Sequence, residues 1–149
     1  MNVRNVLLSQ EFPIKGQDFS HAGNISGKIK ELLQEVGIST GIIRRAAIAS
    51  YEAEMNVVMY ANQGNFKFNL TPHSIRLRVE DQGKGIHDIK LAMKEGYSTA
   101  TDEHREMGFG AGMGLPNIKR NSDRFKIRSQ PGSGTVLDIT IYVNQPEKK

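Results

Sequence analysis

The chain has 149 residues and a mass of 16.6 kDa, the usual size of one domain, so we expect a single domain over residues 1–149. It contains no cysteine, which excludes disulfide bonds, thiol nucleophiles, cysteine zinc sites and iron–sulfur clusters. The net charge of +4 is a mild basic excess, and no apolar run resembles a membrane span of roughly 20 residues or a secretory signal. We therefore expect a cytoplasmic protein that does not contact a membrane.

Basic residues are scattered along the chain except for one cluster toward its C-terminal end. The cluster comprises Lys119, Arg120, Arg124, Lys126 and Arg128. No aromatic residues interleave with these cations, as a surface for single-stranded nucleic acid would require, so we expect no direct nucleic-acid binding. Two readings stay open: a solvated face, or an attractive surface for an acidic protein partner.

The N-terminal part predicts a strand followed by a helix. Residues 3–12 are expected to form the strand, and Asp18 or Ser20 to cap a helix that ends at Gly37. The apolar positions of this helix keep helical spacing, at Ile25, Ile29, Leu32, Leu33 and Val36.

A second, longer helix and two strands are predicted next. The helix is expected to begin at its cap, Ser39, and to run to about Asn62, with Gly64 as its stop signal. Two segments then alternate apolar and polar residues, the period of strands with one buried face. Their apolar positions are Phe66, Phe68 and Leu70 in the first and Ile75, Leu77 and Val79 in the second. We expect these two strands to pair antiparallel.

Glycine-rich segments follow the second of these strands. Residues 81–86 are expected to form a turn and residues 88–95 a short helix. Residues 96–113 are rich in glycine, threonine and charged side chains, without an apolar period, and are too long for an ordinary connection. A loop of this kind is usually functional or disordered.

The C-terminal part predicts one helix and two strands. The helix is expected from Leu115 to about Ser122, with Pro116 tolerated in its first turn because the missing amide would be unpaired there. Phe125 and Ile127 mark a strand, and residues 131–134 form a turn. The last strand carries apolar residues at Leu137, Ile139, Ile141 and Val143, and residues 145–149 are expected to be a frayed tail.

The order of these elements predicts the fold class. Two long helices must bury their apolar stripes against one face of a largely antiparallel sheet. We therefore expect an α+β fold, a two-layer α/β sandwich with a mixed, mostly antiparallel sheet and the helices on one face. The other face of the sheet carries arginine and lysine side chains and is expected to stay solvated.

Two glycine-rich motifs are candidates for ligand binding. In Asp81-Gln82-Gly83-Lys84-Gly85-Ile86, the glycines permit close approach to a flat ligand, and the carboxylate can accept a hydrogen bond, although the pattern alone also fits a simple turn. The second motif, GFGAGMGL, contains Gly108, Gly110, Gly112 and Gly114 just before a predicted helix, an arrangement suited to phosphate oxygens. It is neither a Walker A loop nor a dinucleotide fingerprint, because no Gly-Lys-Ser/Thr follows it and no parallel βαβ unit surrounds it.

A helix face and a hairpin supply the remaining candidates. Glu52 and Asn56 are four residues apart and therefore share one helix face, which taken alone fits the solvent edge of an amphipathic helix. Glu54 lies about 200° around the helix from Glu52 and is expected to be a surface charge. The pair Gly134-Thr135 ends a glycine-rich turn that taken alone predicts a hairpin.

Taken together and in this order, these four motifs resemble the N, G1, G2 and G3 boxes of the GHKL ATPase superfamily, which has the Bergerat ATP-binding fold. The superfamily includes the ATP-binding domains of gyrase, heat-shock chaperones, histidine kinases and MutL. The resemblance covers nearly the whole chain. The segment GFGAGMGLPNIKRNSD is especially similar to the stress-switch branch of the small bacterial anti-sigma-factor serine protein kinases.

The resemblance implies ATP and Mg²⁺ as cofactors and assigns roles to individual residues. It implies that Glu52 is the general base, that Asn56 binds the magnesium ion, and that Asp81 binds the adenine amino group. A mobile lid is implied over about 96–113. The other residues implied to bind the nucleotide are Gly83, Gly85, Ile86, Arg105, Gly108, Gly110, Gly112, Gly114, Leu115 and Thr135.

The same resemblance implies a function and its partners. It implies an ATP- and magnesium-dependent protein serine/threonine kinase that phosphorylates a STAS-type antagonist in a bacterial partner-switching pathway. A sigma factor, a downstream phosphatase or a second copy of the chain are further implied partners. The alternatives are a noncatalytic ATP-binding regulatory module or an ATPase subunit, in which a nucleotide-closed lid controls a partner. Glu52 favours the enzyme, because a protein that only binds ATP needs no base there.

Overall fold

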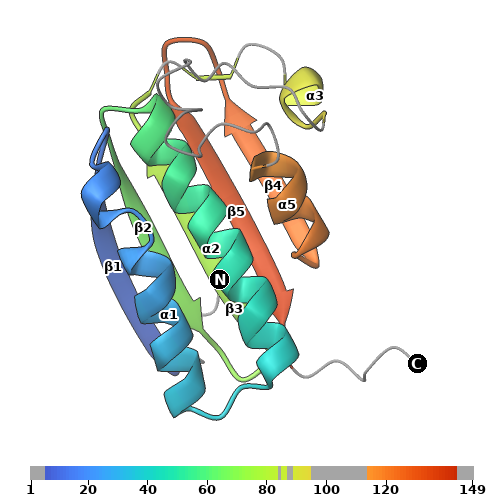
Figure 1. The fold of residues 1–149 in the computed structure, drawn as a ribbon. Coiled ribbons are helices and arrows are strands. Elements are labelled where there is room, and N and C mark those ends of the chain that lie inside the picture. Colours follow the sequence, from blue (N-terminus) through green and yellow to red (C-terminus); the bar gives the residue numbers. More distant parts are fainter. Residues whose placement is uncertain (1–5, 84, 87–88, 95–113, 144–149) are drawn as a thin grey trace.

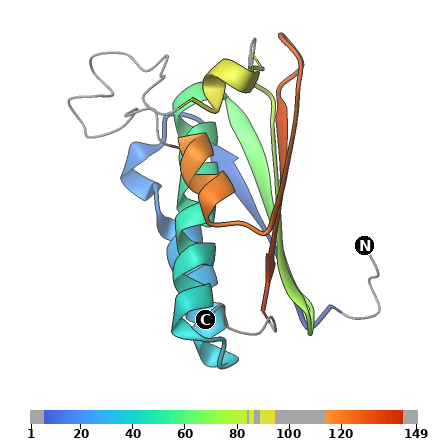
Figure 2. The same cartoon turned by 90° about the vertical axis from the view of Figure 1, so that its right-hand side faces the viewer.

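The computed structural model of the chain describes residues 6–83, 85–86, 89–94 and 114–143. These residues form a two-layer α+β sandwich, in which helices cover one face of a five-stranded sheet (Figures 1 and 2). The predicted fold class is confirmed. The expectation of one domain with a lid at 96–113 and a frayed tail at 145–149 stays a prediction, because both segments lie outside the described residues.

The N-terminal strand and first helix differ in their bounds from the prediction. Strand β1 spans Leu8–Lys15, and a short 3-10 helix at Phe19–His21 precedes α1, Asn24–Glu35. Helix α1 begins after Gly23, which has a left-handed backbone, so the prediction of Asp18 or Ser20 as its cap was wrong. The side chains of these two residues instead hydrogen-bond each other beside the 3-10 helix.

The long second helix is close to its prediction at the N-terminal end. Helix α2 spans Thr40–Tyr60, and its N-cap position is occupied by Ser39, as expected. Gly64 is not the stop signal, because it lies within β2, where a Cβ would stand 2.9 Å from Cγ1 of Val57. The glycine is therefore needed where the strand passes close under the helix.

All strand pairs of the sheet are antiparallel in the described part of the chain, where a mixed sheet was expected. The spatial order of the strands is β1-β2-β3-β5-β4. The strands after β1 are β2 (Gln63–Leu70), β3 (Ser74–Asp81), β4 (Arg124–Ser129) and β5 (Thr135–Tyr142). Two short helices complete the described part of the chain, α3 (Ile89–Ala92) and α5 (Gly114–Arg120).

The core lies between the helix layer and the inward face of the sheet. The alternating apolar residues of β2, β3 and β5 are almost completely buried, which confirms the predicted faces of these strands. Helix α2 contributes small side chains, Ala46, Ala49 and Ala53, each 0% exposed. Small side chains bring the axis of α2 close to the sheet, so α2 is the central element of the helix layer.

One buried carboxylate connects the two long helices. Glu54 of α2 is only 3% exposed. Its Oε2 accepts a hydrogen bond from the backbone N–H of Gly23 at 3.1 Å, and its Oε1 accepts one from Ser26 N–H at 3.4 Å. The prediction of a surface charge was wrong because α2 is covered by α1 as well as by the sheet. Burial raises the pKa of Glu54, while these amide hydrogen bonds oppose the rise.

We predict that Glu54→Ala destabilises the fold by about 1–3 kcal/mol, because the first amides of α1 would lose their buried acceptor. Urea unfolding followed by circular dichroism measures the change. Glu35→Ala is the matched control, since Glu35 is exposed at the other end of α1. Equal unfolding midpoints for the two variants would show that the carboxylate does not hold the start of α1.

Candidate functional site

The end of β3 and the start of β5 hold the first part of the candidate site. Asp81 is the last residue of β3 and pairs in register with Thr135, the first residue of β5. Asp81 Oδ1 accepts hydrogen bonds from the backbone N–H groups of Gly83 at 2.9 Å and Thr135 at 3.2 Å. Burial raises the pKa of Asp81, and the two amide donors oppose the rise. Among the described residues only Oδ1 is engaged, so the second oxygen is available to a ligand.

Glycines allow the surrounding backbones to lie this close. A Cβ on Gly83 would stand 2.9 Å from the carbonyl oxygen of Tyr60 and 3.0 Å from Asp81 Oδ1. Gly134 has φ +80°, and a Cβ there would collide with the backbone carbonyl of Asp81. The glycines near Asp81 therefore allow the turn that follows β3 to pack against the end of α2 and against the β4–β5 hairpin.

Ser129, the last residue of β4, joins the same turn to the hairpin and was missed by the sequence analysis. Its Oγ accepts a hydrogen bond from Ile86 N–H at 2.7 Å and donates one to the carbonyl oxygen of Gly134 at 3.0 Å. The Thr135 hydroxyl lies 2.8 Å from Ser129 Oγ. The available signal was the position of a serine two residues before the glycine-rich turn at 131–134. A hairpin prediction gives no reason to expect this serine to contact Ile86.

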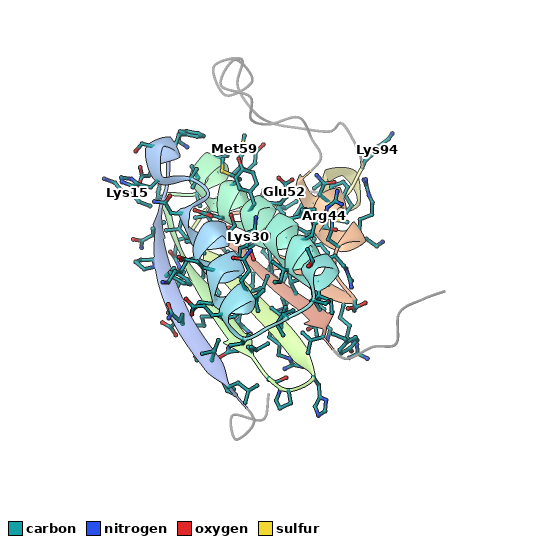
Figure 3. The ribbon with its side chains drawn as sticks, turned by 60° about the horizontal axis from the view of Figure 1, so that its bottom comes forward. Lys15, Lys30, Arg44, Glu52, Met59 and Lys94 are labelled. Carbon is teal, nitrogen blue, oxygen red and sulfur yellow. The ribbon has the colours of Figure 1, made fainter. Side chains whose placement is uncertain are left out.

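The second part of the candidate site lies between α2 and α5. Glu52 is half-buried on α2, and its Oε2 accepts a hydrogen bond from Nδ2 of Asn117 on α5 at 3.3 Å (Figure 3 labels Glu52). Burial raises the pKa of Glu52, and the Asn117 donor opposes the rise. Asn56 follows one turn later and is also half-buried. Glu52 is therefore not simply at the solvent edge of an amphipathic helix, because α5 packs against it, and Asn56 shares its helix face by the four-residue spacing.

Asn117 was also missed by the sequence analysis. It stands three residues after Gly114, so the start of α5 brings both residues to Glu52: a Cβ on Gly114 would lie 3.6 Å from Glu52 Oε2. Leu115, predicted to bind the nucleotide, has its side chain buried in the hydrophobic core, so any contact it makes to a ligand comes from its backbone. Helix spacing alone does not reveal which residue of another helix faces Glu52.

The C-terminal half of α2 lies between the two parts of the site. Glu52 contacts α5, Asn56 lies one turn further along the same helix face, and the end of the helix at Tyr60 contacts Gly83 in the turn after Asp81. Several predicted nucleotide-binding residues lie outside the described residues, namely Arg105, Gly108, Gly110 and Gly112. Thr135 contacts Asp81 directly, whereas Ile86 and Gly85 lie against Ser129 and Gln130 of the neighbouring hairpin. The role of these residues in nucleotide binding stays a prediction.

The donor set near Asn56 limits what kind of metal could bind. Within the described ranges, no group of three or more histidine, cysteine, aspartate or glutamate side chains could hold a metal ion. Mg²⁺ commonly keeps several waters and takes phosphate oxygens, so one carboxamide oxygen suffices when a nucleotide is bound. The residues present therefore fit a magnesium ion delivered with a nucleotide and do not form a metal cage of their own.

Comparison with known proteins gives a family match and similar relatives. A family model described as "Histidine kinase-, DNA gyrase B-, and HSP90-like ATPase" matches residues 42–147. The chain is 32% identical over 118 residues to the serine/threonine-protein kinase RsbT of Bacillus subtilis, covering 76% of this chain and 83% of RsbT. It is 25% identical over 149 residues to an anti-sigma F factor of Caldanaerobacter subterraneus, covering 95% and 96% of the two chains.

Two solved structures share the fold at low sequence identity. The SiaB–SiaC complex from Pseudomonas aeruginosa matches with a TM-score of 0.62 and 16% identity, covering 92% of this chain and 90% of the matched chain. The RsbU and RsbW domains of Rv1364c from Mycobacterium tuberculosis match with the same TM-score and identity. That match covers 93% of this chain, which spans about a third (34%) of the Rv1364c chain. No helix in the described residues is both long and apolar enough to cross a membrane.

We predict that Ser129→Ala lowers the free energy of unfolding by about 1–3 kcal/mol, because the Ile86 amide and the Thr135 hydroxyl would lose a half-buried partner. Ser133→Ala is the matched control, since Ser133 is exposed in the same hairpin. Urea unfolding of both variants measures the difference. A loss of stability as large in the control would contradict the assigned role of Ser129.

Proposed function

Because this chain belongs to the family of histidine kinase-, DNA gyrase B- and HSP90-like ATPases, we propose that it is an ATP-dependent serine/threonine-protein kinase acting on a protein partner. The observation that carries the proposal is the placement of Glu52. This half-buried carboxylate is held by Asn117 and stands one helical turn from Asn56. The similarity to a curated serine/threonine-protein kinase over 83% of that protein's length supports the same assignment.

The adenine ring is assigned to the β3–β5 end of the site. Asp81 would accept a hydrogen bond from the adenine amino group through Oδ2, because Oδ1 is already held by two amides. Thr135 would support this carboxylate from the neighbouring strand. Gly83 and Gly85 would leave room for the flat base beside the turn.

The triphosphate is assigned to the α2–α5 end of the site. The carboxamide oxygen of Asn56 would bind a magnesium ion, which supplies charge neutralisation for the phosphates when bound. Gly114 at the start of α5, together with Arg105, Gly108, Gly110 and Gly112 in the predicted lid at 96–113, would surround the phosphates. The proposed contacts to adenine and the proposed contacts to the phosphates therefore come from separate segments of the chain.

Glu52 is the proposed general base. It would take the proton from a serine or threonine hydroxyl of the partner as that oxygen bonds to the γ-phosphorus and the bond from phosphorus to the ADP oxygen breaks. The phosphoryl group passes to the partner, ADP leaves, and the proton remains on Glu52 until it is lost to water. Most of the rate acceleration would come from alignment and charge neutralisation.

The partner is proposed to be a STAS-type antagonist in a cytoplasmic partner-switching pathway. Similarity to several anti-sigma F factors supports a regulatory role, with a sigma factor, a downstream phosphatase or a second copy of this chain as further partners. A noncatalytic regulator or an ATPase subunit would also bind ATP. The half-buried, hydrogen-bonded position of Glu52 favours the kinase over both.

We predict that two single variants separate nucleotide binding from transfer. Asn56→Ala should lose magnesium-dependent ATP binding in calorimetry, because the metal would have no protein ligand. Glu52→Gln should bind ATP with unchanged affinity and transfer less than about 1% of the wild-type label to a STAS-domain protein, because the base contributes roughly 10²–10⁴-fold. Undiminished transfer by Glu52→Gln would remove Glu52 from the mechanism, and free phosphate without labelled partner would support an ATPase instead.

We predict a distinctive pH dependence for transfer. Burial raises the pKa of Glu52 above its ordinary value of 4.5, so the base is protonated and inactive below that raised pKa, and the rate should rise as pH increases through it. Asn117→Ala should move this acidic limb to higher pH, because it removes a donor that stabilises the carboxylate, while leaving the affinity for ATP unchanged.

The matched control for this experiment is Asn121→Ala. Asn121 is the same residue type just after α5, and its side chain donates to the backbone carbonyl of Asn117, not to Glu52. Its pH profile should coincide with that of the unmodified protein. Identical profiles for Asn117→Ala and Asn121→Ala would show that Asn117 does not tune the base.

A further inference from the structure

The face of the sheet opposite the helices is not covered by any described element. Figure 2 shows the helices on one side of the strands only. Strand β5 illustrates the exposure of this face. Its four inward side chains are buried, whereas the four side chains that alternate with them and point outward are only partly buried. A sheet face of five strands and about eight residues measures roughly 24 by 26 Å. The flat area of the whole face, roughly 600 Å², is about three quarters of the 800 Å² or so that one partner buries in a standard interface.

Most of the net positive charge of the chain lies on this face. The outward positions of the adjacent strands β3, β5 and β4 carry five basic and two acidic side chains. They are Arg76, Arg78, Arg124, Lys126 and Arg128, with Glu80 and Asp138. The surplus of three accounts for most of the net charge of +4. The cluster identified in the sequence thus divides, with its β4 members joining two arginines of β3 on one surface.

Internal ion pairs satisfy only part of this surface. Arg78 lies 2.7 Å from Glu80 and 3.6 Å from Asp138, and Arg128 lies 3.7 Å from Asp138. Among the described residues, Arg76, Arg124 and Lys126 have no carboxylate within ion-pair distance. Asp123, next to Arg124 in sequence, is occupied by Arg45 at 3.2 Å and by the backbone N–H of Tyr142 at 2.8 Å.

The strand register places the two uncompensated arginines on either side of one threonine. Arg76 on β3 and Arg124 on β4 are both paired with Thr140 on β5. Two strand spacings separate their Cα atoms, a distance of about 10 Å. Both long side chains can therefore reach one carboxylate lying over Thr140. Asn69, paired with Arg76 from β2, extends the row with another hydrogen-bonding side chain.

We propose that this open sheet face, centred on Arg76, Thr140 and Arg124, is the docking surface for an acidic protein partner. A guanidinium group binds a carboxylate through two parallel hydrogen bonds, and arginine and tyrosine are enriched at protein interfaces. Tyr142, outward-facing and partly buried on β5, borders the arginine row. The surface therefore combines charge complementarity to carboxylates with the side chains that protein interfaces favour.

The carboxylates on the face select a protein over other anionic partners. Asp138 and Glu80 lie among the cations and would repel a continuous row of phosphates on a nucleic acid or a lipid surface. A folded acidic partner can place its carboxylates over the arginines and its donors over Asp138. The face lies on the opposite side of the sheet from Glu52 and Asn56, so docking leaves the candidate catalytic site accessible.

The test is an NMR titration of the full chain with a short poly-L-glutamate peptide. Amide shifts should change along β3, β4 and β5. The double variant Arg76→Glu/Arg124→Glu should weaken binding at least about tenfold. The matched control is Lys30→Glu/Arg44→Glu, which changes the net charge equally on the helix layer, where both residues line a groove of about 500 Å³ (Figure 3). The control should weaken binding less than about twofold.

The outcomes that overturn the proposal are specific. Equal weakening by the two double variants would mean that only net charge matters. Tighter binding to a DNA duplex or to phosphatidylglycerol vesicles than to the peptide, at the same salt concentration, would assign the face to another class of partner. If the glutamate variant fails to fold, Arg76→Gln/Arg124→Gln tests the same contacts, and unchanged affinity there contradicts them. ATP binding, measured separately, should be the same in all variants.

Discussion

The close packing of helix α2 on the middle of the sheet is the constraint on which the rest of the structure depends. Three fully buried alanines face inward along this helix, and Gly64 keeps β2 clear of Val57. A helix held this close to the sheet is also covered by its neighbours on both sides. The buried polar side chains of α2 must therefore form hydrogen bonds with particular residues of the neighbouring elements. Each of these hydrogen bonds fixes the neighbouring element in position relative to the sheet.

Two carboxylates on α2 show how this constraint produces both stability and chemistry. Glu54 points to α1 and accepts hydrogen bonds from the first amides of that helix, so its buried charge is well solvated by the protein. Glu52 points to α5 and, among the described residues, accepts one hydrogen bond, from the carboxamide of Asn117, so it is less satisfied than Glu54. Burial raises the pKa of both groups, but only Glu52 is partly exposed, so only Glu52 can be reached by a substrate hydroxyl.

Features set by the local sequence pattern could be predicted, whereas contacts between distant elements could not. Alternation in β2 and β3 identified the buried residues Phe66 and Leu77, because the period of a strand is decided by the chain itself. The four motifs identified Asp81 and Thr135, which the β3–β5 register brings together. The partners Asn117 and Ser129 were not predictable from one sequence, since each acts through a contact with a distant element. Glu54 was misjudged because a helical wheel assumes one buried face, and α2 has two.

The distribution of charge separates the two surfaces of the molecule. Among the described residues, the candidate nucleotide site contributes the carboxylates of Glu52 and Asp81 and the neutral carboxamide of Asn56. A triphosphate bound there would rely on its metal ion, on backbone amides and on the segment at 96–113 for charge neutralisation. The arginines of β3 and β4 stand on the other side of the sheet, too far away to assist. Neither nucleotide binding nor the packing of the fold explains their excess positive charge. Binding of a separate acidic protein partner explains it directly.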